Sequence, residues 1–397
     1  MSEYTDKING LKQKVSLMLQ ERSKNYNRAS SQCPSSFWAD NLSLFDYAAS
    51  LSPENFLNIR FHAGYLSGVN VLQNWHQYQS IDSGRYADMI GYKFLIRDVP
   101  ERYHIGEPPT PKLPIPLGIK YLGKVINIDI RRYQSCISNL YSMGILEALL
   151  KGGDKKVVME IGAGYGGLAH HLSKILGKKC TYIILDLPEI LLFSGGYLIV
   201  NNPRKKIYVY EKRTFTPEFL TSGMYEYDYV LLPNFALKDL YAVSEVNLMI
   251  NMQSFQEMTR EQIKEYMEFG HKKLSGYLYS DNMDRHPFTD VLAPDTVTTL
   301  MEERFRLFPP PEYYKKAIGY GSPVLGTWPY KCYAGILKDR STPWNQGGMI
   351  KVVGRLARYS FTRQKNGVKF RGERKWLERL IVWGLKVVQF VMSRHRK

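Results

Sequence analysis

The sequence predicts a doubly wound α/β fold with a mainly parallel central sheet. Short apolar runs typical of buried strands alternate with segments of helical apolar spacing through the middle of the chain. The first of these runs, residues 157–161, leads directly into a glycine-rich turn at 162–167. A strand, a glycine turn and an amphipathic segment in this order are typical of a nucleotide-binding unit.

The segments before the sheet differ in character. Residues 1–50 have the polarity of helix and loop, and from Ser52 to Val99 apolar residues at helical spacing predict a helical N-terminal subdomain. The proline-rich segment 108–116 predicts an extended arm, and 126–150 predict a helix that leads into the first strand. We therefore expect three regions, at 1–125, 126–340 and 341–397.

Six strands are expected in the central region, at 157–161, 181–186, 228–232, 247–251, 277–281 and 331–337. Helical patterns lie between most of them. Residues 208–227 form an irregular insertion that fits either a hairpin or a loop. The proline- and aromatic-rich stretch 287–329 predicts a cap over the binding site.

The glycine turn predicts a cofactor site. The spacing of Gly162, Gly164 and Gly167 also matches the dinucleotide fingerprint, but Glu160 stands two residues before the first glycine. A carboxylate there is unfavourable beside a pyrophosphate, whereas it can accept hydrogen bonds from an amino-acid ammonium, as in S-adenosylmethionine. The alternative for Glu160 is a solvated acid at the strand end. The expected contacts of that cofactor are Glu160, Gly162, Ala163, Gly164, Tyr165 and Gly166.

Asp186 ends the second apolar run, 22 residues after Gly164. This is close to the spacing of roughly 20 residues expected for an acid that binds ribose hydroxyls. We expect Asp186 and the adjacent Leu187 to contact the cofactor, and an N-cap role for Asp186 is a compatible alternative. Ligands of open parallel sheets lie beyond the carboxyl ends of the strands. On that ground Pro233, Asn234 and Asn251 are added to the cofactor site.

Three motifs resemble the sugar O-methyltransferases of bacterial polysaccharide clusters, within the class I S-adenosylmethionine-dependent methyltransferases. They are E-I-G-A-G-Y-G-G-L from Glu160, D-L-P-E from Asp186 and N-M-Q-S-F-Q-E-M from Asn251. The resemblance covers roughly residues 95–340. It implies a Rossmann-like fold with a seven-stranded sheet, S-adenosylmethionine as cofactor, and methyl transfer to a hydroxyl. The implied acceptor is a sugar nucleotide or a lipid-linked or polymeric glycan of surface polysaccharide biosynthesis.

A hydroxyl acceptor usually needs a base, because a sugar hydroxyl is a weak acid. Glu257, Asp281 and His286 follow the fourth and fifth strands, and each could accept the proton. Glu257 lies in the third motif, and its alternative is a structural carboxylate that bonds backbone or an arginine. His286 fits a loop histidine equally well, and His170 and His171 fit a helix face better than a ligand role.

No metal site is predicted, because no His or Cys cluster has metal-ligand spacing, although residues 281–284 carry hard oxygen donors. Three other functions stay open. They are methyl transfer to another small-molecule hydroxyl, nicotinamide-dependent oxidation, which Glu160 disfavours, and a catalytically inactive scaffolding role.

The net charge of +17 is concentrated at one end of the chain. Residues 351–397 hold 14 Lys or Arg and two Glu, so +12 of the charge lies there. Lys375, Arg379 and Lys386 form a polar stripe along an apolar run, 380–392, that is shorter than the roughly 20 residues a bilayer span needs. This pattern predicts binding to an anionic membrane surface, with packing on the protein or on a second subunit as the alternative. No nucleic-acid partner is expected.

The cysteines and the N-terminal residues bear on the cellular compartment. The four cysteines are far apart with no C-x-x-C, and residues 1–20 lack the apolar core of a signal peptide. We therefore expect a cytoplasmic protein, peripheral at the inner face of the membrane if the tail binds there. The sequence leaves a homo-oligomer open.

Overall fold

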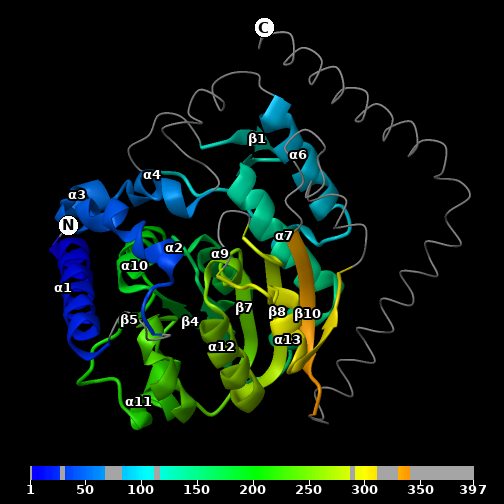
Figure 1. Ribbon diagram of the computed structural model, residues 1–397. Helices are drawn as coiled ribbons and strands as arrows, with labels where there is room; N and C mark the ends of the chain where they lie inside the picture. Colours follow the sequence, from blue (N-terminus) through cyan, green and yellow to red (C-terminus); the bar gives the residue numbers. More distant parts are fainter. Residues whose placement is uncertain are drawn as a thin grey trace, which may run out of the picture.

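A computed structural model describes residues 2–26, 32–67, 83–110, 117–286, 291–310 and 330–339. Its centre is one sheet of eight strands, in the order β5-β6-β4-β3-β7-β8-β10-β9 (Figure 1). β10 runs antiparallel to both of its neighbours, and the other pairs are parallel. The strands are β3 (Lys156–Ile161), β4 (Cys180–Asp186), β5 (Ile207–Val209), β6 (Tyr229–Pro233), β7 (Val246–Met252), β8 (Leu274–Met283), β9 (Phe305–Phe308) and β10 (Tyr330–Leu337). A separate antiparallel hairpin joins β1 (Ile119–Tyr121) and β2 (Lys124–Ile126).

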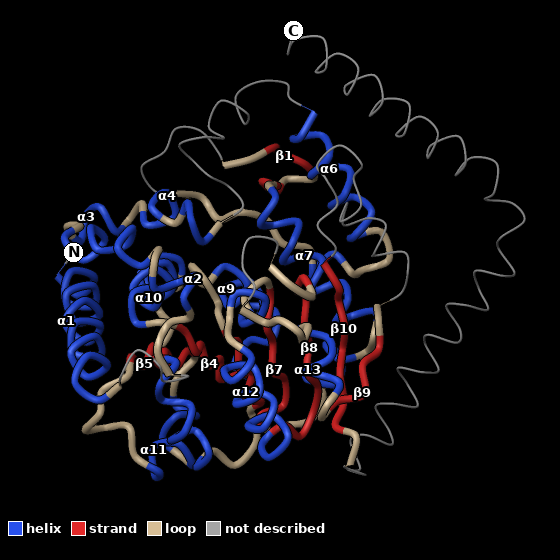
Figure 2. The backbone as a smooth tube through the Cα atoms, viewed as in Figure 1, coloured by secondary structure: helices blue, strands red, loops and turns tan. Residues whose placement is uncertain are grey.

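The middle strands are mainly apolar because helices cover both faces of the sheet. Every residue of β4 and of β6 is buried. On one face α9 contacts both α7 and α10, and on the other face α12 contacts η6 and α13 (Figure 2). The helices of the central region are α7 (Ile128–Ser142), α8 (Ile145–Leu150), α9 (Gly167–Leu176), η4 (Gly177–Lys179), α10 (Pro188–Asn201), α11 (Pro217–Thr221), η5 (Gly223–Glu226), η6 (Asn234–Ala242), η7 (Phe255–Glu257), α12 (Arg260–Lys273) and α13 (Val297–Glu302).

The direction in which the chain adds strands reverses beside β3. From β3 it proceeds to β4 and β6 on one side, and it then returns to add β7 and β8 on the other side of β3. In open parallel sheets, the crevice at the carboxyl ends of the strands beside such a switch point is the usual ligand site.

The N-terminal helices pack on the same core. α1 lies along α10 at the edge of the fold, and its buried side chains, including Ile8 and Leu11, belong to the main hydrophobic cluster (Figure 1). The helices of this part are α1 (Ser2–Asn25), α2 (Ser36–Ala39), η1 (Leu42–Ser50), α3 (Pro53–Phe56), α4 (Ile59–His62), η2 (Gly64–Leu66), α6 (Ser83–Ile96) and η3 (Glu101–Tyr103).

A buried ion network ties these helices to the core. Arg60 of α4 is 3% exposed, and its Nε donates to Glu107 Oε1 at 2.7 Å. Its Nη2 donates to Asp129 Oδ2 of α7 at 2.9 Å. Asn127, the N-cap of α7, donates to Glu107 as well. The guanidinium therefore joins three segments that are distant in sequence.

The six strands expected from the sequence are all present, as β3, β4, β6, β7, β8 and β10. The count of seven is corrected to eight among the described residues, since β5 and β9 lie in the stretches read as an insertion and a cap. The expected helix at 126–150 is two helices, because Gly144 takes a φ of 76° between α7 and α8. Within the described residues, no helix combines the length and apolarity needed to cross a bilayer. The tail at 341–397 lies outside the described residues, and its membrane role stays a prediction.

Candidate active site at the switch point

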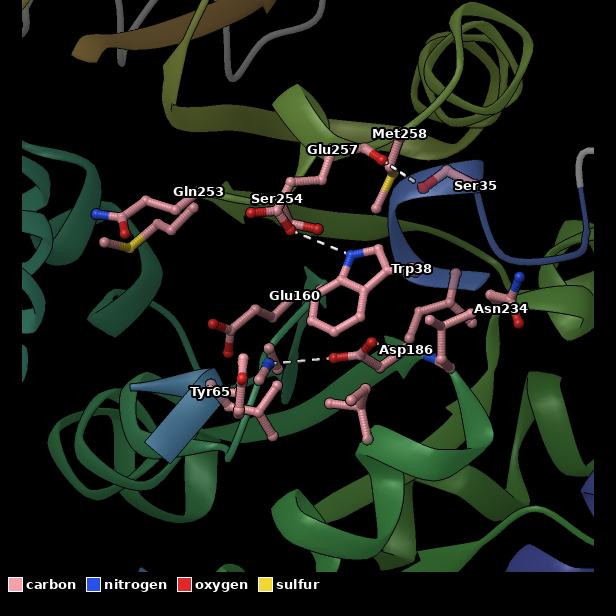
Figure 3. A pocket seen from close by; sticks show the side chains of 18 of the residues that line it. Ser35, Trp38, Tyr65, Glu160, Asp186, Asn234, Gln253, Ser254, Glu257 and Met258 are labelled. Carbon is pink, nitrogen blue, oxygen red and sulfur yellow. Dashed lines mark hydrogen bonds between the residues drawn. The ribbon is translucent and has the colours of Figure 1, made fainter. Parts of the chain in front are cut away.

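A cavity of about 280 Å³ lies at the carboxyl ends of β3, β4 and β7. It brings together residues between Pro34 and Tyr266, including some from the N-terminal helices (Figure 3). Of the residues expected to form the site, Glu160, Gly162, Ala163, Gly164, Asp186, Leu187, Asn234 and Glu257 line this cavity.

The glycine turn requires its first glycine for two reasons. Gly162 has a φ of 68°, which side-chain-bearing residues rarely adopt. A Cβ at this position would also lie 2.0 Å from Ser254 Oγ, so the loop after β7 can approach only because no side chain is present. Tyr165 and Gly166 lie outside the lining. Tyr165 is instead buried beneath the Arg60 guanidinium, 4.3 Å from its ring centroid.

Glu160 is buried rather than solvated at the strand end. Its side chain lies in the cavity wall, and Tyr182 donates its hydroxyl to Oε2 at 2.7 Å. Burial raises the pKa of Glu160 to about 8, which the Tyr182 hydrogen bond opposes and the nearby Asp186 reinforces. This carboxyl group can therefore lose its proton when a positively charged ligand group arrives.

Asp186 holds the glycine turn against the end of β4. Its Oδ2 accepts from the amide of Gly164 at 3.1 Å, and its Oδ1 accepts from the amide of Leu187 at 2.8 Å. Burial raises the pKa of Asp186 to about 7 against these backbone donors. Each oxygen keeps a further acceptor site for ligand hydroxyls. The N-cap of α10 is Leu187, with Pro188 at the first helical position, so Asp186 is not the capping residue.

Of the three remaining residues expected to contact the cofactor, one lines the cavity and two do not. Asn234 lines the cavity, and its Nδ2 donates to the carbonyl of Gln32 at 2.7 Å. Pro233 pairs with Asp186 at the strand ends but is outside the lining. Asn251 is fully buried, where its Nδ2 donates to the carbonyl of Ile161 at 2.8 Å and its Oδ1 accepts from the amide of Phe255 at 3.0 Å. Asn251 therefore shapes the loop after β7 from below.

Glu257 faces Glu160 and Asp186 from across the cavity (Figure 3). The indole of Trp38 donates its Nε1–H to Glu257 Oε2 at 3.1 Å, and no arginine is bonded to this carboxylate in the described structure. Burial raises the pKa of Glu257 to about 8, and the Trp38 hydrogen bond lowers it. A carboxyl group with a pKa near the working pH suits a general base.

The other two expected bases are not in the lining. Asp281 is completely buried within β8, where its backbone carbonyl accepts from the amide of Gln253 at 2.9 Å. His286 lies beside the ring of Phe37, 4.9 Å between centroids, and burial lowers its pKa. Geometry thus favours Glu257 among the three.

Much of the cavity wall was not predictable from the sequence. Ser35 and Trp38 come from a segment more than 200 residues away from Glu257, and Tyr65 and Ser67 come from the region after α4. Gln253, next to the Ser254 contact, has a φ of 56° without being a glycine. Such strain is concentrated at functional sites, but only coordinates reveal it.

The charge of the lining is acidic. Among the described residues, its ionisable carboxyl groups are Asp129, Glu160, Asp186 and Glu257, and Arg132 is the one basic side chain in the lining. Asp129 is neutralised by Arg60, but within the described residues the other three carboxyl groups form no ion pair. The cavity should therefore attract a cationic ligand and repel a polyanionic one. No group of three His, Cys, Asp or Glu in the described part of the chain could hold a metal ion.

Comparisons with known proteins give distant likenesses. No protein-family model matches the chain, and no curated protein matches it. An O-methyltransferase family protein from Burkholderia thailandensis is 9% identical, with 54% of this chain and 61% of that chain covered and a TM-score of 0.29. Aeropyrum pernix fibrillarin, solved with natively bound S-adenosyl-L-methionine, is 14% identical over 55% of this chain and 80% of that one, with a TM-score of 0.30. A Haemonchus contortus N-methyltransferase, solved with S-adenosylhomocysteine, is 8% identical over 50% and 52%, with a TM-score of 0.29.

Proposed function

We propose that this protein is an S-adenosylmethionine-dependent methyltransferase that acts on a hydroxyl group. The observation that carries the proposal is the acidic cavity at the switch point, with Glu160 and Asp186 on either side of a glycine turn. Glu160 would hold the cofactor ammonium, Asp186 the ribose hydroxyls, and Gly162 to Gly164 the backbone edge of the site. A sulfonium cation with an ammonium group matches this charge.

The same charge argues against a nicotinamide dinucleotide. A pyrophosphate beside the glycine turn would lie near Glu160 and Asp186, with Arg132 as the one basic side chain in the lining. A pyrophosphate would oppose ionisation of these two carboxyl groups and gain no attraction from them, whereas a cation would stabilise their charged forms. This argument depends on the side chains of the chain itself and favours the methyltransferase over the oxidoreductase.

The residues around the acceptor end have simple roles. When bound, the cofactor supplies an electrophilic methyl group. Glu257 accepts the proton of the acceptor hydroxyl, and Trp38 holds the Glu257 carboxylate in place through its indole N–H. The segment that carries Ser35 and Trp38 covers this end of the cavity and excludes water, which strengthens the electrostatic contacts inside.

We further propose a sugar hydroxyl as the acceptor. Aromatic and hydrogen-bonding side chains also line the cavity, namely Tyr65, Tyr133, Gln253 and Arg132. Tyrosine rings can stack on a sugar ring, and guanidinium and amide groups can form hydrogen bonds with its hydroxyls. Another small-molecule hydroxyl would use the same groups, and a scaffolding module would bind cofactor without turnover.

Two measurements test the proposal. Isothermal titration should give binding of S-adenosylmethionine and S-adenosylhomocysteine, and no binding of NAD. Incubation with sugar nucleotides and lipid-linked oligosaccharides should then release S-adenosylhomocysteine, with a mass increase of one methyl group in the acceptor. Binding of NAD alone would overturn the assignment, and cofactor binding without turnover on any hydroxyl acceptor would favour the scaffolding role.

Cofactor affinity should depend on pH in a defined direction. Because the pKa of Glu160 is about 8 in the free protein, its proton must leave before it can bind an ammonium. Affinity should therefore rise up to about tenfold per pH unit from pH 6 towards pH 8. It should fall again above pH 8, as the cofactor amino group loses its own proton. Titration calorimetry across this range checks it, and Glu160→Gln should flatten the rise. Affinity that decreases from pH 6 to pH 8 would contradict the role of Glu160.

Removing the indole donor should shift the pH dependence of the reaction. Trp38→Phe keeps the aromatic ring but deletes the hydrogen bond that lowers the pKa of Glu257. The acidic limb of the rate profile should move to higher pH by about half to one unit, since one such bond contributes about 1 kcal/mol. Ser35→Ala is the matched control, because Ser35 bonds the backbone carbonyl of Glu257 and not its carboxylate. An unmoved limb in Trp38→Phe would exclude Glu257 as the titrating base.

A further inference from the structure

A second cavity, of about 700 Å³, lies outside the candidate active site. Its walls are the segment 102–110, the β1–β2 hairpin and one side of α9 between His170 and Ile175. It shares no lining residue with the first cavity. The volume falls within the range of small-molecule sites.

The charge of this second cavity is the opposite of the first. Arg102, Lys120, Lys124 and Lys174 line it, and Glu107 is the one acidic side chain that the described residues contribute. Glu107 is already engaged, because Arg60 and Asn127 both donate to its carboxylate. No ion pair is recorded for the three lysines within the described residues, so their charge is available to a ligand. Burial lowers the pKa of Lys174, which an anion would reverse.

Two buried histidines add neutral donors to this wall. Asn202 Nδ2 lies 3.0 Å from His170 Nδ1, and an amide donor there places the imidazole hydrogen on His170 Nε2. The adjacent His171 is 5% exposed, and its Nε2 has no hydrogen-bond partner in the described structure. Burial lowers the pKa of His171, with added contributions from His170, Lys174 and Lys124. An unpartnered buried polar atom in a native structure calls for an explanation, and a ligand is one.

We propose that this cavity binds a ligand through a phosphoryl or diphosphoryl group. Phosphate oxygens accept several charge-assisted hydrogen bonds, and lysines and neutral imidazoles around one concave site supply such donors. The cationic side chains surround a cavity rather than forming an extended stripe, which favours a compact anion over a nucleic-acid strand. The cavity lies against α9, the helix that follows the glycine turn. The proposal concerns ligand binding only and includes no chemical reaction.

The two cavities are separated by a thin shared wall. The ring of Tyr133, which lines the first, lies 6.3 Å from the ring of His171, which lines the second. Glu107 in the second is joined to Asp129 in the first through Arg60. An anion bound in the second cavity would therefore lie close to His171 and Glu107, which connect to the first cavity through Tyr133 and Arg60.

Inorganic pyrophosphate is the probe, titrated into the full chain by calorimetry at low salt. The parent should bind it, and the double variant Lys124→Gln/Lys174→Gln should lose roughly tenfold in affinity per lysine. Lys178→Gln removes one lysine charge, where the double variant removes two, from an exposed position just after α9 and outside the lining, and it should bind like the parent. Adding sodium chloride should weaken binding by the parent.

A spectroscopic readout makes the result specific to the cavity. Pyrophosphate should shift the imidazole ¹⁵N resonances of His171 and raise its pKa, which surface binding would leave unchanged. A nucleoside diphosphate and a prenyl diphosphate are titrated in separate experiments. The one that binds more tightly than pyrophosphate shows whether the diphosphate group belongs to a nucleotide or to a lipid. Equal affinity of the double variant and Lys178→Gln, no binding by the parent, or binding of an oligonucleotide without pyrophosphate would each overturn the proposal. None of these outcomes depends on methyl transfer.

Discussion

Replacing Glu257 with glutamine should lower the rate of methyl transfer roughly 100-fold or more while leaving cofactor affinity within a few-fold of the parent. The glutamine carbonyl can still accept from Trp38 Nε1, so the geometry of this wall is kept while the proton acceptor is lost. The measurement is single-turnover release of S-adenosylhomocysteine, with cofactor binding measured separately.

Glu261→Gln is the matched control for this variant. Glu261 is an exposed residue of the first turn of α12, four positions from Glu257, and its replacement changes the net charge equally. It should retain the parental rate. If Glu257→Gln also reacts within a few-fold of the parent, the base assignment is wrong and solvent or His286 must receive the proton.

Removal of either cofactor carboxylate should weaken S-adenosylmethionine binding by about 1.5 to 3 kcal/mol, or about 10- to 150-fold. Asp186→Ala deletes the acceptors for the ribose hydroxyls, and Glu160→Ala deletes the acceptor for the ammonium. Calorimetry or equilibrium dialysis measures the loss.

Conservative variants separate binding from folding here, because Asp186 also holds the amides of Gly164 and Leu187. Glu160→Gln keeps an acceptor oxygen for the Tyr182 hydroxyl, so its thermal unfolding should stay near the parental value while affinity falls. Asp186→Asn keeps an acceptor for one of its two backbone amides and places an NH2 group against the other, so its thermal unfolding measures how much of the affinity loss comes from the fold. Asp154→Asn, an exposed residue before β3, is the control for charge. Unchanged affinity in both carboxylate variants would exclude the proposed cofactor site.

The parts of the fold that were predictable from sequence are those with a local signature. β3 and β4 are continuous apolar runs that end in or just beyond an acid, and the glycine turn reveals the start of α9. β5, with three residues, and β9, with four, are too short to give a periodic signal, and they exist because longer strands pair with them.

The site divides in the same way. Glu160 and Asp186 were predictable because strand ends and glycine turns fix their positions within a few residues. Asn251 also lies at a strand end, but its side-chain amide forms hydrogen bonds with the backbone of Ile161 and Phe255. The sequence alone does not reveal which hydrogen bonds a side chain forms. Trp38 was not predictable, because its contact with Glu257 joins residues 219 positions apart.

The buried guanidinium of Arg60 bears on how a ligand enters. If the N-terminal helices detached, Glu107 would lose the guanidinium that it pairs with in its buried surroundings, and Asp129 would keep Arg132 at 3.6 Å but lose Arg60. Breaking a buried pair of this kind costs about 3–5 kcal/mol. Opening by release of the whole N-terminal part would thus consume much of the stability of an average domain. We therefore expect the ligand to enter by displacement of the short segment around Trp38 alone, while α4 keeps its contacts with the core. The rate of ligand entry should then depend on a hinge within residues 32–50.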